Sequence, residues 1–144
     1  MRYPYVKYNG RHLPIIPVEL KKGEEWIVFD AYIDSGAGYS IFHTDVAAIL
    51  GIDIETGEES FVVVGDGSKI KVYIHNLKVK LMDKEFEAVI GFSHRLGIGF
   101  NILGQESVFD RFRICFDRKE KVVELYPKDI PSKADEEDKD KRRI

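Results

Sequence analysis

A run of β-branched and aromatic residues, 26–33 (WIVFDAYI), leads directly into the triplet Asp34-Ser35-Gly36. Such a run is typical of a strand that is largely buried. A carboxylate at the end of a buried strand leaves water only when nearby donors satisfy it. Ser35 offers a hydroxyl, and Gly36 lets backbone amides approach closely. The stretch therefore predicts a strand that delivers one carboxylate, Asp34, to a tight turn suited to charge chemistry.

The rest of the chain alternates short strand patterns with turn signals. Strands are predicted over residues 15–20, 25–33, 61–64, 69–74, 77–81, 86–92, 100–103, 113–116 and 122–126. Asn9-Gly10 adds an early hairpin turn. Only two short helices are expected: one has Thr44 as its N-cap and ends at Gly51, and the other lies within residues 105–112. This pattern predicts an all-β barrel of hairpins.

Length and charge set the expected organisation. A chain of 144 residues, 44% of them hydrophobic, suits one domain with one core. We predict an N-terminal extension over residues 1–14, a single domain over residues 15–126, and a charged, disordered tail over residues 127–144. The net charge is −3 and the basic residues are interleaved with acidic ones, so no nucleic-acid partner is expected.

The compartment is predicted from cysteine usage and from the lack of targeting signals. Cys115 is the single cysteine, which suits a reducing interior, and its apolar neighbours predict a packed thiol. The first residues lack the apolar core of a signal peptide, and no run is long enough to cross a membrane. We therefore expect a cytoplasmic protein without a membrane partner. The four histidines have no compact ligand spacing, so neither a metal nor another cofactor is expected.

Three sequence landmarks, in this order, resemble those of the retropepsin-like (retroviral-type) aspartic proteases. They are Ile33-Asp34-Ser35-Gly36-Ala37, the turn Gly65-Asp66-Gly67-Ser68, and Asn101-Ile102-Leu103-Gly104. The resemblance spans roughly residues 25–125. It implies an acid-protease-type half-barrel, with one lobe per chain, and the activity of an aspartic endopeptidase.

Peptide hydrolysis by carboxylates needs two of them, one ionised to activate water and one protonated to donate to the scissile carbonyl. This chain has one Asp-Ser-Gly triplet. The resemblance therefore implies a homodimer in which two copies of Asp34 share a proton. It also implies that Ser35 bonds across the dimer and that Gly36 leaves room for an extended or unfolded polypeptide substrate. A bell-shaped pH profile on the acid side of neutral is expected.

The resemblance also assigns substrate-binding positions. The turn Gly65-Asp66-Gly67-Ser68 matches the flap, a hairpin tip that closes over the substrate. Taken alone it is more simply an ordinary hairpin turn, but its position after the Asp34 loop and the first helix favours a flap. Residues at positions that line side-chain pockets are Tyr32, Ala37, Phe100 and Ile102, with core packing as the alternative. Ile102, Leu103 and Gly104 match the segment that supports the Asp34 loop from beneath.

Two features differ from the retroviral proteases. An Asp and an Arg that brace the retroviral dimer are replaced here by Gly38 and Gln105. The retroviral interface interleaves free chain ends, whereas this chain has an extra hairpin over residues 113–126 and a charged tail. Two alternatives therefore stay open: a catalytically silent peptide-binding or dimerisation module of the same fold, and a self-processing or regulatory protease with a narrow substrate.

Overall fold

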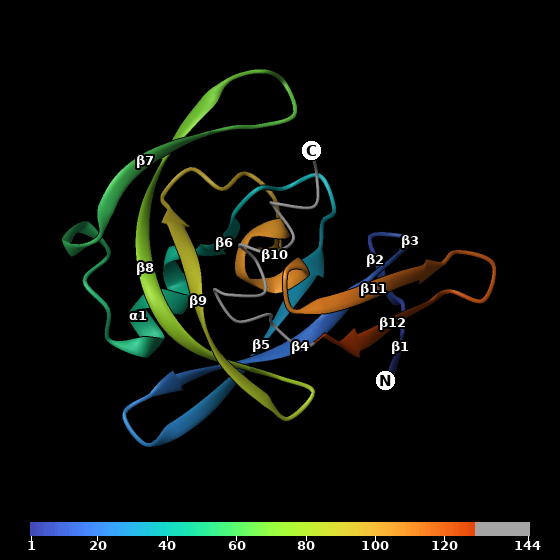
Figure 1. The fold of residues 1–144 in the computed structure, drawn as a ribbon. Coiled ribbons are helices and arrows are strands. Elements are labelled where there is room, and N and C mark those ends of the chain that lie inside the picture. Colours follow the sequence, from blue (N-terminus) through green and yellow to red (C-terminus); the bar gives the residue numbers. More distant parts are fainter. Residues whose placement is uncertain (129–144) are drawn as a thin grey trace, which may run out of the picture.

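A seven-stranded mixed sheet forms the body of the computed structural model, which describes residues 1–128 (Figure 1). The strand order is β4-β5-β10-β6-β9-β8-β7, and β4 also pairs with β8, so the sheet closes on itself. Its strands are β4 (Ile15–Lys22), β5 (Glu25–Ile33), β6 (Ser40–His43), β7 (Glu58–Val63), β8 (Lys69–Leu81), β9 (Lys84–Ser93) and β10 (Asn101–Leu103). The predicted all-β fold is confirmed.

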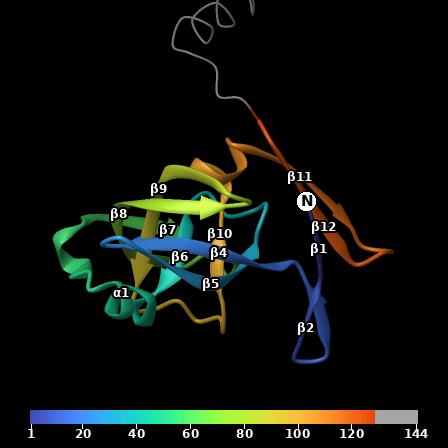
Figure 2. The ribbon, with the colours of Figure 1, turned by 90° about the horizontal axis from the view of Figure 1, so that it is seen from below.

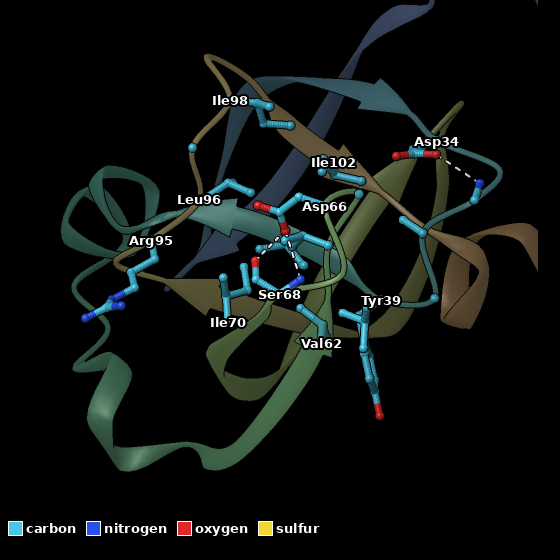
Figure 3. A pocket seen from close by; sticks show the side chains of 18 residues that line it. Asp34, Tyr39, Val62, Asp66, Ser68, Ile70, Arg95, Leu96, Ile98 and Ile102 are labelled. Atoms are coloured by element: carbon cyan, nitrogen blue, oxygen red, sulfur yellow. Dashed lines mark hydrogen bonds between the residues drawn. The ribbon is translucent and has the colours of Figure 1, made fainter.

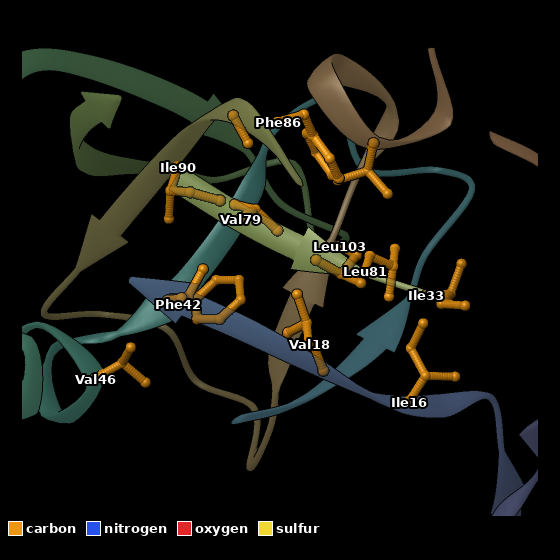
Figure 4. Close-up of a cluster of buried hydrophobic side chains, with 14 of the residues drawn as sticks. Ile16, Val18, Ile33, Phe42, Val46, Val79, Leu81, Phe86, Ile90 and Leu103 are labelled. Atoms are coloured by element: carbon orange, nitrogen blue, oxygen red, sulfur yellow. The ribbon is translucent and has the colours of Figure 1, made fainter. Parts of the chain in front are cut away.

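The core lies inside this closed sheet. Side chains alternate between the two faces of a strand, so every second residue points inward. Figure 4 shows the resulting cluster, to which β4, β5, β6, β8, β9 and β10 contribute. Its largest fully buried members include Ile16, Val18, Ile33, Phe42, Val79, Leu81, Ile90 and Leu103. Each such side chain stabilises the fold by about 1.5–3 kcal/mol.

Two strand predictions are corrected by the structure. Residues 69–74 and 77–81, predicted as separate strands, form the single strand β8, because His75 and Asn76 pair with Ile90 and Val89 and continue the ladder. The four-residue strand β6 was not predicted at all. It is too short to show a periodic pattern, and its neighbours β9 and β10 specify it instead.

The first helix, α1 (Thr44–Leu50), is confirmed, and Gly51 ends it with the predicted left-handed conformation (φ 73°). Its N-cap is His43 rather than Thr44, because β6 runs through His43 and the helix begins directly at the end of the strand. A 3₁₀ turn that was not predicted, η1 (Ile54–Thr56), follows it, and the Asp53 side chain accepts a hydrogen bond from the Glu55 N–H.

The second predicted helix, over residues 105–112, is wrong as a regular helix. The segment η2 (Gln105–Phe109) is one irregular turn, interrupted at Ser107, which has a φ of 72°. The Ser107 hydroxyl accepts a hydrogen bond from the Val89 N–H of β9, and the Ser107 N–H donates to Asp110. These bonds favour a non-helical backbone at Ser107.

A smaller three-stranded sheet, in the order β1-β12-β11, stands beside the body (Figure 2). It contains β1 (Arg2–Pro4), β11 (Phe112–Asp117) and β12 (Val122–Pro127). The predicted Asn9-Gly10 hairpin is confirmed as β2 (Val6–Tyr8) and β3 (Arg11–Leu13). The prediction that Cys115 is packed is wrong: Cys115 is exposed, because it shares with Arg113 a face of β11 that is open to solvent.

Among residues 1–128, the structure contains no helix with the length and apolar character needed to span a bilayer. The charged run at 135–143, on which the predicted tail rests, lies outside the described residues.

Candidate active site

Asp34 lies where β5 leaves the sheet and the chain turns into a loop. Its backbone N–H donates to the Leu103 carbonyl oxygen (3.0 Å), which continues the parallel pairing of β5 with β10. The Gly36 N–H donates to Asp34 Oδ1 (2.9 Å), and the Ala37 N–H donates to the Asp34 carbonyl (3.2 Å). The side chain is half-buried, and within residues 1–128 no hydrogen bond reaches its second oxygen, Oδ2. The loop therefore fixes one oxygen of the carboxylate and leaves the other available.

Gly104 supports this loop from beneath. A Cβ atom at this position would lie 2.5 Å from the Tyr39 carbonyl oxygen and 2.8 Å from that of Ala37. The Gly104 N–H donates to the buried Ser40 hydroxyl oxygen (3.0 Å). Because both neighbouring atoms are backbone, only glycine lets the two segments approach this closely.

Gln105 ties the same loop to the following segment. Its backbone N–H donates to the Ala37 carbonyl (2.8 Å), and its side-chain Nε2 donates to the Ser35 carbonyl (2.7 Å). The Glu106 N–H donates to the Gly38 carbonyl (2.9 Å). Gln105 and Gly38, which replace the bracing ion pair of retroviral proteases, thus both take part in hydrogen bonds that hold the Asp34 loop within its own chain.

A groove of about 970 Å³ opens beside Asp34 (Figure 3). Its walls come from the Asp34 loop, the turn between β7 and β8, the loop after β9, and β10. Most of the side chains that line it are apolar, namely Ala37, Tyr39, Ile41, Val62, Val63, Val64, Ile70, Leu96, Ile98 and Ile102. The groove suits the apolar side chains of an extended ligand.

The turn between β7 and β8 covers part of this groove. The Val64 N–H donates to the Ser68 carbonyl (2.9 Å), and the Gly67 N–H donates to the Val64 carbonyl (2.9 Å). Asp66 Oδ1 accepts hydrogen bonds from both the N–H (2.9 Å) and the hydroxyl (2.5 Å) of Ser68. The hydroxyl bond above all, and then the amide bond, lower the pKa of Asp66. Asp66 is thus kept ionised within the turn.

The groove brings together many of the predicted site residues: Asp34, Gly36, Ala37, Gly65, Asp66, Ser68 and Ile102. Gly67 belongs to the same turn, with a φ of 85°, but does not line the groove. Tyr32 and Phe100 lie outside it. Their rings stack with centroids 5.0 Å apart, and Phe100 also packs edge-on against Tyr8 (5.4 Å). Leu103 is fully buried.

One wall of the groove was not predicted from the sequence. Arg95, Leu96, Gly97 and Ile98 line it from the loop between β9 and β10, which was predicted only as a connection. The available signal was the pair of apolar residues, Leu96 and Ile98, in an otherwise polar and glycine-rich loop.

A second hollow, of about 500 Å³, also contains Asp34. Ser35 and Tyr32 line this hollow and not the groove. Asp34 is the residue that the two depressions have in common.

The sequence matches no protein-family model and no curated protein. Its structure is similar to a retropepsin-like aspartic protease from Rickettsia conorii, with a TM-score of 0.59 and 18% identity over 88% of this chain and 98% of that one. It is also similar to the retroviral protease-like domain of Ddi1 from Leishmania major (TM-score 0.54, 19% identity, 83% and 92% covered). A third similar structure is the EIAV protease in complex with the inhibitor HBY-793 (TM-score 0.50, 19% identity, 69% and 88% covered). The chain therefore has the retropepsin-like fold.

Proposed function

We propose that the protein is an aspartic endopeptidase that works as a homodimer, with one Asp34 from each subunit. The observation that best supports this is the position of Asp34. Its half-buried carboxylate is held through one oxygen by its own loop and borders a largely apolar groove that a hairpin turn partly covers. The expected substrates are extended or unfolded polypeptides with apolar residues near the cleaved bond.

The second carboxylate has to come from another copy of the chain. Among residues 1–128, Asp66 is the other acidic residue that lines the groove. Its hydrogen bonds from Ser68 lower its pKa, so it stays ionised and is unsuited to donate a proton. A two-fold axis beside Asp34 supplies an equivalent carboxylate, and the exposed Ser35 is then placed to contact the partner loop.

The proposed mechanism uses one proton shared between the two Asp34 carboxylates. Repulsion between like charges prevents both from ionising together, so one stays protonated over an intermediate pH range. The ionised carboxylate removes a proton from water, which attacks the scissile carbonyl while the other carboxylic acid protonates its oxygen. The tetrahedral intermediate then collapses as a proton passes to the leaving amine. Backbone groups of Gly36 and of the 64–68 turn hold the substrate in an extended conformation. No cofactor takes part.

Location and partners are part of the same proposal. The protein acts in the cytoplasm, pairs with a second copy of itself and takes polypeptides as substrates. It has no nucleic-acid or membrane partner.

The test compares wild type with Asp34→Asn on an unfolded protein substrate between about pH 3 and pH 7, the span over which a coupled carboxylate pair titrates. We expect cleavage with a bell-shaped pH profile for wild type and a loss of about 10³-fold in Asp34→Asn. Asp30→Asn makes the same chemical change at an exposed residue of β5 that lines neither depression, and it should keep most of the activity. Analytical ultracentrifugation checks that all three proteins are dimers.

A folded wild-type dimer that cleaves nothing would contradict the proposal. It would favour the catalytically silent module, which binds extended peptides equally well with Asp34 or Asn at this position.

A further inference from the structure

The peptide group between Ser35 and Gly36 takes part in two hydrogen bonds of the Asp34 loop. Its carbonyl oxygen, which belongs to Ser35, accepts a hydrogen bond from Nε2 of Gln105 (2.7 Å). Its N–H, which belongs to Gly36, donates to Oδ1 of Asp34 (2.9 Å). The Gln105 side chain is therefore connected to the Asp34 carboxylate through a single peptide group.

This connection is stiff because the peptide group is planar and trans, with its C=O and N–H pointing in opposite directions. A donor that fixes the Ser35 carbonyl oxygen therefore also fixes the direction of the Gly36 N–H. Hydrogen bonds at the two ends of one peptide group polarise each other. The bond from Gln105 to Ser35 thus strengthens the bond from Gly36 to Asp34.

Packing within the chain does not hold this peptide group, since both Ser35 and Gly36 are exposed. Among residues 1–128, Gln105 Nε2 is the group that donates to the Ser35 carbonyl oxygen. A carbonyl oxygen only accepts hydrogen bonds, so the Gln105 amide has to present its NH₂ group there. The orientation of the peptide group accordingly depends on the Gln105 side chain.

Backbone bonds hold the start of this side chain in place. The Gln105 N–H donates to the Ala37 carbonyl (2.8 Å), and the Glu106 N–H donates to the Gly38 carbonyl (2.9 Å). These bonds attach the beginning of η2 to the part of the loop that follows Gly36. They do not involve the Gln105 amide group, so the effect of that group can be tested separately.

We propose that Gln105 is a positioning residue for the catalytic carboxylate. Its amide orients the Ser35–Gly36 peptide group, the Gly36 N–H then holds Oδ1 of Asp34, and Oδ2 stays available for water and for the Asp34 of the second copy. This inference rests on the proposed function and concerns turnover rather than substrate binding, because Gln105 lines neither the groove nor the second hollow.

The test measures kcat and KM on an unfolded protein substrate, at the pH where wild type is most active. Gln105→Met keeps the length of the side chain and removes its donors. We expect kcat to fall about tenfold with KM unchanged, because a displaced reacting group lowers the rate of the chemical step without weakening substrate binding. Gln105→Lys returns a donor to the same exposed position and should recover most of the wild-type kcat.

Glu106→Met is the matched control. It makes the same kind of change at the neighbouring residue, which is also exposed and lines neither depression, and it should keep the wild-type kcat. All three variants retain the backbone bonds of residues 105 and 106. Analytical ultracentrifugation gives the dimer mass, and chemical denaturation the folded fraction, so that kcat is compared per folded dimer.

Three results would overturn the inference while leaving the proposed function standing. The first is an unchanged kcat in Gln105→Met. The second is a rise in KM at unchanged kcat, which would place Gln105 in substrate binding. The third is a loss of kcat that Gln105→Lys does not restore, because the missing donor would then not be its cause.

If wild type cleaves nothing, the proposed function fails, and the position of the Gly36 amide proton in the NMR spectrum tests the inference by itself. A hydrogen bond to a carboxylate moves this resonance downfield. A smaller downfield shift in Gln105→Met, restored in Gln105→Lys, would support Gln105 as the residue that positions the Asp34 carboxylate. The same Gly36 resonance in wild type and Gln105→Met would overturn that role.

Discussion

At the scale of single residues, the site depends on backbone groups that stand close together. Gly104 lies against the carbonyl oxygens of Tyr39 and Ala37, and its N–H is bound by the Ser40 hydroxyl. These contacts connect β10 to the loop that follows Asp34, so the position of the carboxylate depends on the absence of a side chain at Gly104.

Gly104→Ala is therefore expected to destabilise the protein by about 2–4 kcal/mol, because the added Cβ meets backbone atoms at 2.5 Å and the loop has to shift. Chemical denaturation measures this change. Gly38→Ala is the matched control, since a Cβ at Gly38 meets nothing within 4 Å. Equal stabilities of the two variants would show that the loop can shift around the added Cβ without lowering the free energy of unfolding.

Asp34-Ser35-Gly36 could be identified from the sequence because a short polar triplet after a long apolar strand is a local pattern. The roles of Ser40 and Gln105 could not, because each bonds to a residue far along the chain. Ser40 bonds to Gly104, and the Gln105 side chain bonds to Ser35. Cys115 gave a wrong prediction for a related reason: apolar neighbours in sequence do not reveal which face of a strand is covered.

At the scale of elements, the turn between β7 and β8 combines an exposed tip with internal hydrogen bonds. Phe61 and Val63 of β7 are 61% and 67% exposed, and Val62, Val63 and Val64 line the groove. The strand and its turn thus combine apolar residues that line the groove with large apolar side chains that are exposed to solvent. At the tip, the Asp66 carboxylate binds Ser68 and holds the turn together.

The bonds between Asp66 and Ser68 predict how this turn responds to pH. The pKa of Asp66 is lowered from its ordinary value of 3.8, so the hydrogen-bonded form is fully present above pH 3.8 and is lost as the pH falls through the lower folded value. An NMR titration of the Ser68 amide should therefore show a midpoint below 3.8. A midpoint at or above 3.8 would mean that the carboxylate does not hold the turn in solution.

Local signals predicted the elements that are defined by their own sequence. The Asn9-Gly10 hairpin, the end of α1 at Gly51 and the β4–β5 hairpin all appear as expected. Elements fixed by their neighbours were missed or misassigned. β6 exists because it lies between β10 and β9, and η2 is irregular because Ser107 bonds to Val89 of β9. The groove wall at residues 95–98 was not predicted, because it depends on how the loop between β9 and β10 lies against the rest of the groove.

At the scale of the whole molecule, the first and last described strands belong to one small sheet. β1 pairs with β12 through Arg2, Tyr3 and Pro4, and the Leu125 N–H donates to the Met1 carbonyl (3.0 Å). Val123 and Leu125 of β12 are fully buried in the main core. Residues 1–4 were predicted as part of an extension. Residues 2–4 pair instead with the edge of β12, and side chains of β12 complete the core.

Deletion of residues 1–4 should accordingly lower the melting temperature by about 5 °C, because it leaves the edge of β12 unpaired and uncovers part of the core beneath Tyr3. Differential scanning calorimetry gives the value. Arg2→Ala removes only an exposed ion pair with Glu124 and should change stability by less than about 1 kcal/mol. An unchanged melting temperature after the deletion would contradict the role of β1.

The pairing of β1 with β12 within one chain also bears on how the protein is regulated. A subunit whose terminal strands are already paired needs no partner to complete its own sheet, so folding and association are separate steps. If two copies of Asp34 are required, as proposed, the amount of active dimer at low concentration rises with the square of the subunit concentration. Tenfold dilution then reduces the rate per unit volume about a hundredfold. The concentration of the chain in the cell would then control its activity, and no inhibitor or modification would be needed for this control.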